Sequence, residues 1–238
     1  MNFPFETPLE RLIRESREKQ EAENRKKLLS GFLGLAAGYQ SNPYSTILGS
    51  GLLPTKRNVF ISYHHGDDAE VKTFIKRWTE AESVFTPKGL GLRFTDDIIK
   101  SDNPEYVMSQ IRAKYIQDAS VTIVLLGTCT HSRRYVDWEI KASLRQEKNG
   151  LPNGLLGIIL PSRGNTAHLP ERFAANWTDG HINCYARFWV APSSATELRG
   201  WIEDAYSSRT KKAHLIKNSA DMMKNNATCQ SCGYTHPA

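Results

Sequence analysis

From Lys56 onward, short apolar segments alternate with segments that have the periodicity of amphipathic helices. The runs "NVFISY", "SVTIVLL" and "GLLGIIL" are almost continuously apolar, as strands buried on both faces of a sheet are. Five segments are predicted as strands: 58–63, 91–96, 120–126, 154–160 and 181–186. Helices are predicted between and after them at 67–82, 103–119, the segment that contains Val136, and 195–216. This alternation predicts the α/β class, with a central parallel five-stranded sheet and helices on both faces.

The loops that follow the first three predicted strands are polar and rich in hydrogen-bonding groups. They read "SYHHGDD", "FTDDIIKSD" and "LGTCTHSRR". In parallel sheets of this kind, ligands bind beyond the carboxyl ends of the strands, at the point where the strand order reverses. The candidate functional site is therefore expected at these loops.

The helix that follows the third loop carries a carboxylate beside its apolar face. Val136, Ile140 and Leu144 recur at i, i+4 and i+8, so this face belongs to a core. Glu139 stands next to Ile140, at the margin of that face. A glutamate early in a helix is also favoured by the helix dipole alone, so the residues leave two interpretations open: a solvated helix residue or the working group of a site.

The chain is expected to have four parts. Residues 1–56 form an N-terminal helical extension and linker, with Thr7 as a helix cap and Pro8 in the first turn. Residues 57–190 form the main domain, 191–217 its closing helix, and 218–238 a C-terminal tail. The most apolar N-terminal stretch, 28–39, is shorter than the roughly 20 residues that a membrane span needs.

Charge and cysteine content suggest a soluble protein with free thiols. The net charge of +6 is a mild basic bias, compatible with an anionic ligand and too weak to indicate a specific nucleic-acid partner. A secretory signal is not expected, because the first 24 residues are rich in charges of both signs. A cytoplasmic location, where thiols stay reduced, is the simplest interpretation of the four cysteines.

The C-terminal tail contains one C-x-x-C motif, and known catalytic motifs are missing from the sequence. Cys229, Cys232 and His236 offer three metal ligands, whereas a structural zinc site usually needs four. The fourth would come from elsewhere, such as His214, or from a second chain; a frayed tail or a redox-sensitive thiol pair is the alternative. The sequence has no G-x-S-x-G, P-loop or H-E-x-x-H motif, nor the H-x-E of zinc deaminases.

The motifs "NVFISYHHGDD" and "SVTIVLLGTCTHSRRYVDWEIKAS" together resemble the TIR-like domains (Toll/interleukin-1 receptor homology), and most of all the TIR component of bacterial Thoeris antiphage systems. The first is "NVFISYHHGDD", with Ser62, Tyr63, His64 and Asp67 at the family's strand-end motif. The second is "SVTIVLLGTCTHSRRYVDWEIKAS", in which the helix opening carries Glu139 and Ile140. The F-x-D of the family's second strand matches Phe94, Asp96 and Asp97. The resemblance covers residues 57–190.

The resemblance implies a flavodoxin-like three-layer fold and cleavage of NAD⁺ at the nicotinamide–ribose bond. Glu139 aligns with the family's catalytic glutamate. The resemblance thus implies NAD⁺ as the substrate. Because nicotinamide leaves as a neutral base, no general acid is needed, and neither a cofactor nor a metal is implied. The substrate-binding residues expected around it are Ser62, Tyr63, His64, Asp67, Asp96, Thr128, Arg133 and Trp138. Of these, Arg133 is suited to the diphosphate, and the ring of Tyr63 or Trp138 to stacking on a base; Trp138 is equally suited to a core.

The resemblance also implies a role in antiviral defence. The implied product is ADP-ribose or a cyclic form of ADP-ribose, and a cyclic signal would activate a separate effector protein. Assembly into a homo-oligomer is a further expectation, because TIR enzymes often complete their pocket on assembly. Two alternatives remain open: a non-catalytic interaction module and a nucleotide-binding protein without turnover.

Overall fold

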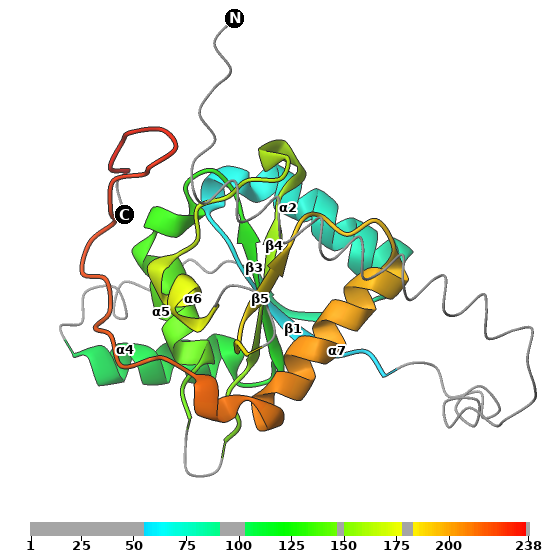
Figure 1. Cartoon of the computed structure of the whole chain (residues 1–238), viewed down its shortest axis with the longest axis horizontal. Helices are drawn as coiled ribbons and strands as arrows, with labels where there is room; N and C mark the ends of the chain where they lie inside the picture. Colours follow the sequence, from blue (N-terminus) through cyan, green and yellow to red (C-terminus); the bar gives the residue numbers. More distant parts are fainter. Residues whose placement is uncertain (1–54, 91–102, 147–149, 178–182, 237–238) are drawn as a thin grey trace, which may run out of the picture. The chain divides into compact units, whose positions relative to one another are not determined.

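Five parallel strands form the central sheet in the part of the chain that the structure describes (Figure 1). The structure is a computed structural model and describes residues 55–90, 103–146, 150–177 and 183–236. The strand order is β2-β1-β3-β4-β5, which is the flavodoxin-like order. The strands are β1 (Asn58–Ser62), β2 (Thr86–Leu90), β3 (Val121–Leu126), β4 (Gly154–Ile159) and β5 (Arg187–Trp189). The predicted parallel five-stranded sheet is confirmed.

Helices cover both faces of this sheet and complete the three layers (Figure 1). One face carries α2 (Asp68–Ile75), which continues as the π-helical η4 (Lys76–Ala81), and α7 (Ala195–Lys211). The other face carries α4 (Pro104–Ile111), the π-helical η5 (Arg112–Ile116), α5 (Arg134–Ser143) and α6 (Glu171–Asn176). The described residues also contain short 3₁₀ turns: η3 (His65–Asp67), η6 (Thr130–Ser132), η7 (Pro161–Arg163) and η8 (Ala213–Leu215).

The alternation of side chains along β1 divides the core into two clusters. Val59 and Ile61 point to the α2 and α7 face, where they pack with Val71 and Leu198. Phe60 points to the opposite face and packs with Val107, Ile111 and Trp138. Since successive side chains of a strand alternate, Ser62 falls on the same face as Phe60 and so faces α5.

The closing helix packs directly onto β4 because that strand begins with a glycine. A Cβ atom at Gly154 would lie 2.1 Å from the backbone oxygen of Ala205 in α7. The residues Lys56–Ala238 form one compact unit, which includes α7 and the C-terminal tail. Among the described residues, no helix is both long enough and apolar enough to span a bilayer.

Two of the predicted strands lie elsewhere in the structure or beyond what it describes. The predicted strand 91–96 lies outside the described residues, and the strand beside β1 is Thr86–Leu90. The predicted strand 181–186 is wrong for its described part: residues 183–186 are irregular, and β5 follows at Arg187–Trp189. The predicted N-terminal helix also lies outside the described residues.

Candidate active site

The carboxylate of Glu139 is buried against the end of β1. Ser62, the last residue of β1, donates a hydrogen bond from its Oγ to Glu139 Oε2 at 2.5 Å. Ser62 is fully buried and Glu139 is 2 % exposed. Val136 and Ile140 of the same helix are equally buried, so the predicted core face of α5 is confirmed. Glu139 is therefore not a solvated helix residue.

Burial of this carboxylate has a free-energy cost that the hydrogen bond from Ser62 offsets in part. An ionised carboxylate loses several kcal/mol of hydration when it is moved into an apolar interior, unless donors replace the water. Carboxylates held in this way are concentrated at functional sites, where a weakly solvated charge interacts strongly with a charge on a substrate. The pair lies at the junction of β1 and β3, where the strand order reverses and ligands bind in this fold.

Beside this pair, the loops after β1 and β3 bring together His64, Asp67 and Arg133. The Arg133 guanidinium donates from Nη2 to His64 Nε2 at 2.9 Å. Since arginine only donates, His64 accepts with an unprotonated Nε2 and is neutral. Burial, followed by the positive charge of Arg133, lowers the pKa of His64 to about 4. His64 is therefore a neutral hydrogen-bonding group at physiological pH.

Asp67 in η3 is held against the first residue after β3. A Cβ atom at Gly127 would lie 2.0 Å from Asp67 Oδ2, so only glycine allows this approach. Burial, with a smaller contribution from Glu70, raises the pKa of Asp67 to about 6, although Arg133 acts in the opposite direction. Within the described residues, Oδ2 of Asp67 is buried without a hydrogen-bond partner. It is thus available to accept a hydroxyl hydrogen from a ligand.

The β3–α5 loop that carries Thr128 is closed by a threonine side chain. Gly127 donates its backbone N–H to Thr130 Oγ1 at 2.9 Å, and that hydroxyl donates to the backbone oxygen of Leu125 at 3.2 Å. Thr128 is half-buried, and its backbone oxygen accepts a weak hydrogen bond from Cys229 Sγ at 3.5 Å. Thr128 therefore lies between the predicted site and the C-terminal tail.

Two of the aromatic residues expected to contact substrate belong to the core clusters. Tyr63 points to the α2 and α7 face and donates from its hydroxyl to Asp68 Oδ1 at 3.0 Å; burial, then this bond, raises its pKa to about 12. Trp138 packs with Phe60 and donates from Nε1 to the backbone oxygen of Met223 at 2.8 Å. Asp96 lies outside the described residues.

The C-terminal tail packs along α5, a contact that the sequence interpretation missed. Ala227 donates its backbone N–H to the oxygen of Ser132 at 2.9 Å, and the backbone N–H of Arg134 donates to Asn226 Oδ1 at 2.9 Å. In the described residues, Cys129 joins the predicted ligands Cys229, Cys232 and His236 in one cluster. His214, proposed as the fourth ligand, lies exposed in η8 outside this cluster. The one available signal was the position of Cys129, directly after a central strand.

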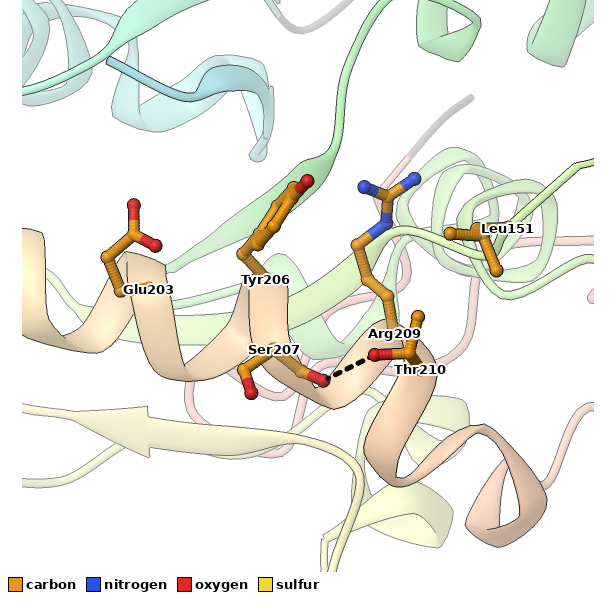
Figure 2. Close-up of a pocket in the computed structure, with 6 residues that line it drawn as sticks. All are labelled: Leu151, Glu203, Tyr206, Ser207, Arg209 and Thr210. Atoms are coloured by element: carbon orange, nitrogen blue, oxygen red, sulfur yellow. Dashed lines mark hydrogen bonds between the residues drawn. The ribbon is translucent and has the colours of Figure 1, made fainter. Parts of the chain in front are cut away.

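A pocket of about 240 Å³ lies along the C-terminal half of α7 (Figure 2). It is lined by Leu151, Glu203, Tyr206, Ser207, Arg209 and Thr210. Leu151 comes just before β4, so this pocket lies at the amino edge of the sheet, opposite the edge that holds Ser62. Its main aromatic side chain is already occupied, because the Arg57 guanidinium lies 3.6 Å from the centre of the Tyr206 ring. The predicted site does not involve it.

Comparison with known protein families finds a match that spans the Glu139 site. Residues 60–165 match the family model described as "Thoeris protein ThsB, TIR-like domain". That range contains β1, β3, α5 and β4, and hence both members of the Ser62–Glu139 pair. A search of curated proteins finds no significant match. Residues 60–165 of this chain therefore belong to the family of TIR-like domains of the Thoeris protein ThsB.

Proposed function

We propose that this chain is a TIR-like enzyme of antiviral defence that cleaves NAD⁺ and releases nicotinamide. The observation that carries the proposal is the buried hydrogen bond between Ser62 and Glu139 at the carboxyl edge of the sheet. It supports a catalytic role because a carboxylate there faces the position at which this fold binds nucleotides. A non-catalytic module would gain nothing from burying this carboxylate, which costs free energy through lost hydration.

The proposed reaction breaks the bond between C1′ of the ribose and N1 of nicotinamide. The electron pair of that bond moves to the nicotinamide nitrogen, which loses its positive charge, so no proton donor is needed. The ribose becomes an oxocarbenium-like cation, and the Glu139 carboxylate stabilises it. Electrostatic stabilisation of this kind contributes about 3–4 kcal/mol, or roughly 10²–10³ in rate, per group. Water then captures C1′ and releases one proton to solvent to give ADP-ribose, or a nucleophile on the same molecule captures it to give a cyclic product.

The neighbouring side chains suit the remaining parts of the substrate. The hydrogen bond from Ser62 fixes the orientation of the Glu139 carboxylate. Asp67 Oδ2, without a partner within the described residues, would accept a ribose hydroxyl, and Arg133 would pair with the diphosphate. Glu139 is only 2 % exposed, so entry of NAD⁺ requires a rearrangement around it. An enzyme that waits for a trigger or for self-assembly would have this property, and a cyclic product would act on a separate effector protein.

The test is incubation of the full-length protein with NAD⁺, followed by liquid chromatography and mass spectrometry. We expect nicotinamide release by the parent and a loss of about 10²–10³-fold in Glu139→Gln. Glu171→Gln is the matched control, because Glu171 is an exposed glutamate in the first turn of α6 and should leave the rate unchanged. The mass of the second product separates hydrolysis from cyclisation.

Equal turnover by Glu139→Gln and the parent would refute the assignment of Glu139. If the purified parent is silent, the assay is repeated in lysate from phage-infected cells that express it. Silence there as well, together with protection of the protein by NAD⁺ against thermal unfolding, would favour a nucleotide-binding module without turnover.

A further inference from the structure

Three thiols and one imidazole converge on a single point next to the candidate active site. Among the described residues, the ligand atoms of Cys129, Cys229, Cys232 and His236 all lie within 4.8 Å of one another. Cys129 Sγ lies 3.1 Å from Cys229 Sγ, 3.7 Å from Cys232 Sγ and 3.3 Å from His236 Nε2, and Cys232 Sγ lies 3.1 Å from the same nitrogen. Thiols are weak hydrogen-bond donors, so hydrogen bonding alone gives little reason for this convergence.

The dimensions of the cluster match a tetrahedral metal centre. Zn–S bonds of about 2.3 Å and Zn–N bonds of about 2.0–2.1 Å hold the ligand atoms roughly 3.5–3.8 Å apart. Four of the six separations are 3.1–3.7 Å, equal to these edges or slightly shorter, and the other two do not exceed 4.8 Å. A disulfide would join two sulfurs at about 2.05 Å and leave the third thiol unused, and all three cysteines are free.

The backbone of the tail is folded so that its three ligands face the same way. Cys229 donates its N–H to the oxygen of Tyr234 at 2.9 Å, and Gly233 donates to the oxygen of Cys229 at 2.8 Å. Gly233 has φ of +75°, a conformation that glycine adopts without strain. This tight turn, "CQSCGY", brings the two cysteines of the C-x-x-C motif onto one side and directs them at Cys129.

We propose that Cys129, Cys229, Cys232 and His236 bind a structural zinc ion that fastens the C-terminal tail to the β3–α5 loop. Three thiolates and one imidazole in a tetrahedral arrangement select zinc. Cys129 and Cys229 are buried and all four positions are filled by protein, so the ion has no open position for substrate and serves the fold rather than the reaction.

The zinc centre also bears on the neighbouring site through charge and position. With three thiolates it has a formal charge of −1, and Arg133, the N-cap residue of α5, follows Cys129 by four residues. The His236 ring lies 6.1 Å from the His64 ring, and His64 is the partner of Arg133. The ion therefore holds the loop that positions Arg133 and His64, and loss of zinc should disorder that loop.

The test is the zinc content of the full-length protein, made without a polyhistidine tag, purified under reducing conditions and measured by inductively coupled plasma mass spectrometry. We expect about one zinc per chain in the parent and less than about a tenth of that in Cys129→Ser. Cys184→Ala is the matched control, since Cys184 is a buried free cysteine outside the cluster and should keep the full zinc content. A strong chelator should lower the melting temperature of the parent and of Cys184→Ala.

A second pair of variants covers the case in which Cys129→Ser does not fold. His236→Cys preserves four ligands and should bind Co²⁺ with the visible absorption of a tetrahedral site and a stronger thiolate charge-transfer band than the parent; His236→Ala should bind it more weakly than both. Three results would each overturn the proposal: a parent without zinc that added Zn²⁺ does not stabilise, a Cys129→Ser protein with full zinc, or a Cys229–Cys232 disulfide in the reduced preparation. None of these measurements depends on NAD⁺ turnover.

Discussion

Asp67 is a residue whose ionised form is disfavoured in the folded protein. Its pKa in the folded protein is about 6, mainly because of burial, whereas an aspartate in an unfolded chain titrates near 3.9. Folding therefore favours the protonated form, and the contribution of this group to stability is fully present below about pH 4 and lost as pH rises through about 6. A carboxylate whose ionised form lowers the stability of the fold is a candidate for a functional role rather than a stabilising one.

Asp67→Asn should consequently stabilise the protein at neutral pH and reduce its activity. The amide cannot ionise, so the melting temperature should exceed that of the parent at pH 7.5, and the difference should shrink towards zero as pH falls from 6 to 4. Differential scanning calorimetry of both proteins across this range measures the effect, and taking the difference between them removes the titration of other groups. A difference that does not vary with pH would show that Asp67 has an ordinary pKa.

The sequence predicted the pair Ser62 and Glu139. The face of the sheet on which the neighbouring residue Tyr63 lies is set by the alternation of side chains along β1. Ser62 and Glu139 were identified from their motifs, and they meet because Ser62 shares the α5 face with Phe60. The same alternation turns Tyr63 to the opposite face, where it binds Asp68 and helps to hold α2. Cys129 could not be paired with Cys229 in advance, because 100 residues separate them and no local pattern links a loop to a distant tail.

Among the elements, α5, α6 and the tail are joined through one buried ion pair. Arg172 in α6 donates from Nε to Asp137 Oδ1 in α5 at 2.8 Å, and both side chains are under 10 % exposed. Arg172 also donates from Nη2 to the backbone oxygen of Asp221, and Asp137 Oδ2 accepts from the backbone N–H of Met223. The pair thus satisfies backbone groups of the tail and holds it against the helix that carries Glu139.

Arg172→Met should be strongly destabilising, because it leaves the Asp137 carboxylate buried without its counter-ion. Removal of one partner of such a pair costs about 3–5 kcal/mol in the free energy of unfolding. Arg199→Ala, on the surface of α7, is the control; its guanidinium donates to the exposed backbone oxygen of Glu82, and the expected change is within about 0.5 kcal/mol. Urea denaturation measures both. A loss of less than about 1 kcal/mol in Arg172→Met would mean that water reaches Asp137.

The accuracy of the strand predictions follows the position of each strand in the sheet. The central strands β1, β3 and β4 were found within a residue or so, because burial on both faces makes their sequences continuously apolar. The edge strand β2 contains Pro87 and Gly89, which are typical of edges and argue against a strand in a sequence read alone. The other edge strand, β5, has only three residues, too few for a periodic signal.

Over the whole molecule, the carboxyl edge of the sheet is where segments distant in sequence meet. The end of β1 supplies Ser62, and the β3–α5 loop supplies Arg133 and the zinc ligand Cys129. The tail supplies the other three ligands of the proposed zinc site. The amino edge, with the pocket along α7, shares none of these residues (Figure 2). Catalysis and attachment of the tail are thus expected to depend on one another.

A fragment comprising residues 56–238 should fold without the N-terminal segment. The described members of both core clusters lie within Lys56–Ala238, which forms a compact unit of its own. We expect the fragment to unfold cooperatively, with a melting temperature close to that of the full chain. Circular dichroism measures this, and light scattering of both proteins then tests whether residues 1–55 promote assembly. A fragment without a cooperative transition would show that the N-terminal segment completes the core, and unchanged mass and activity would exclude both assembly and inhibition as its role.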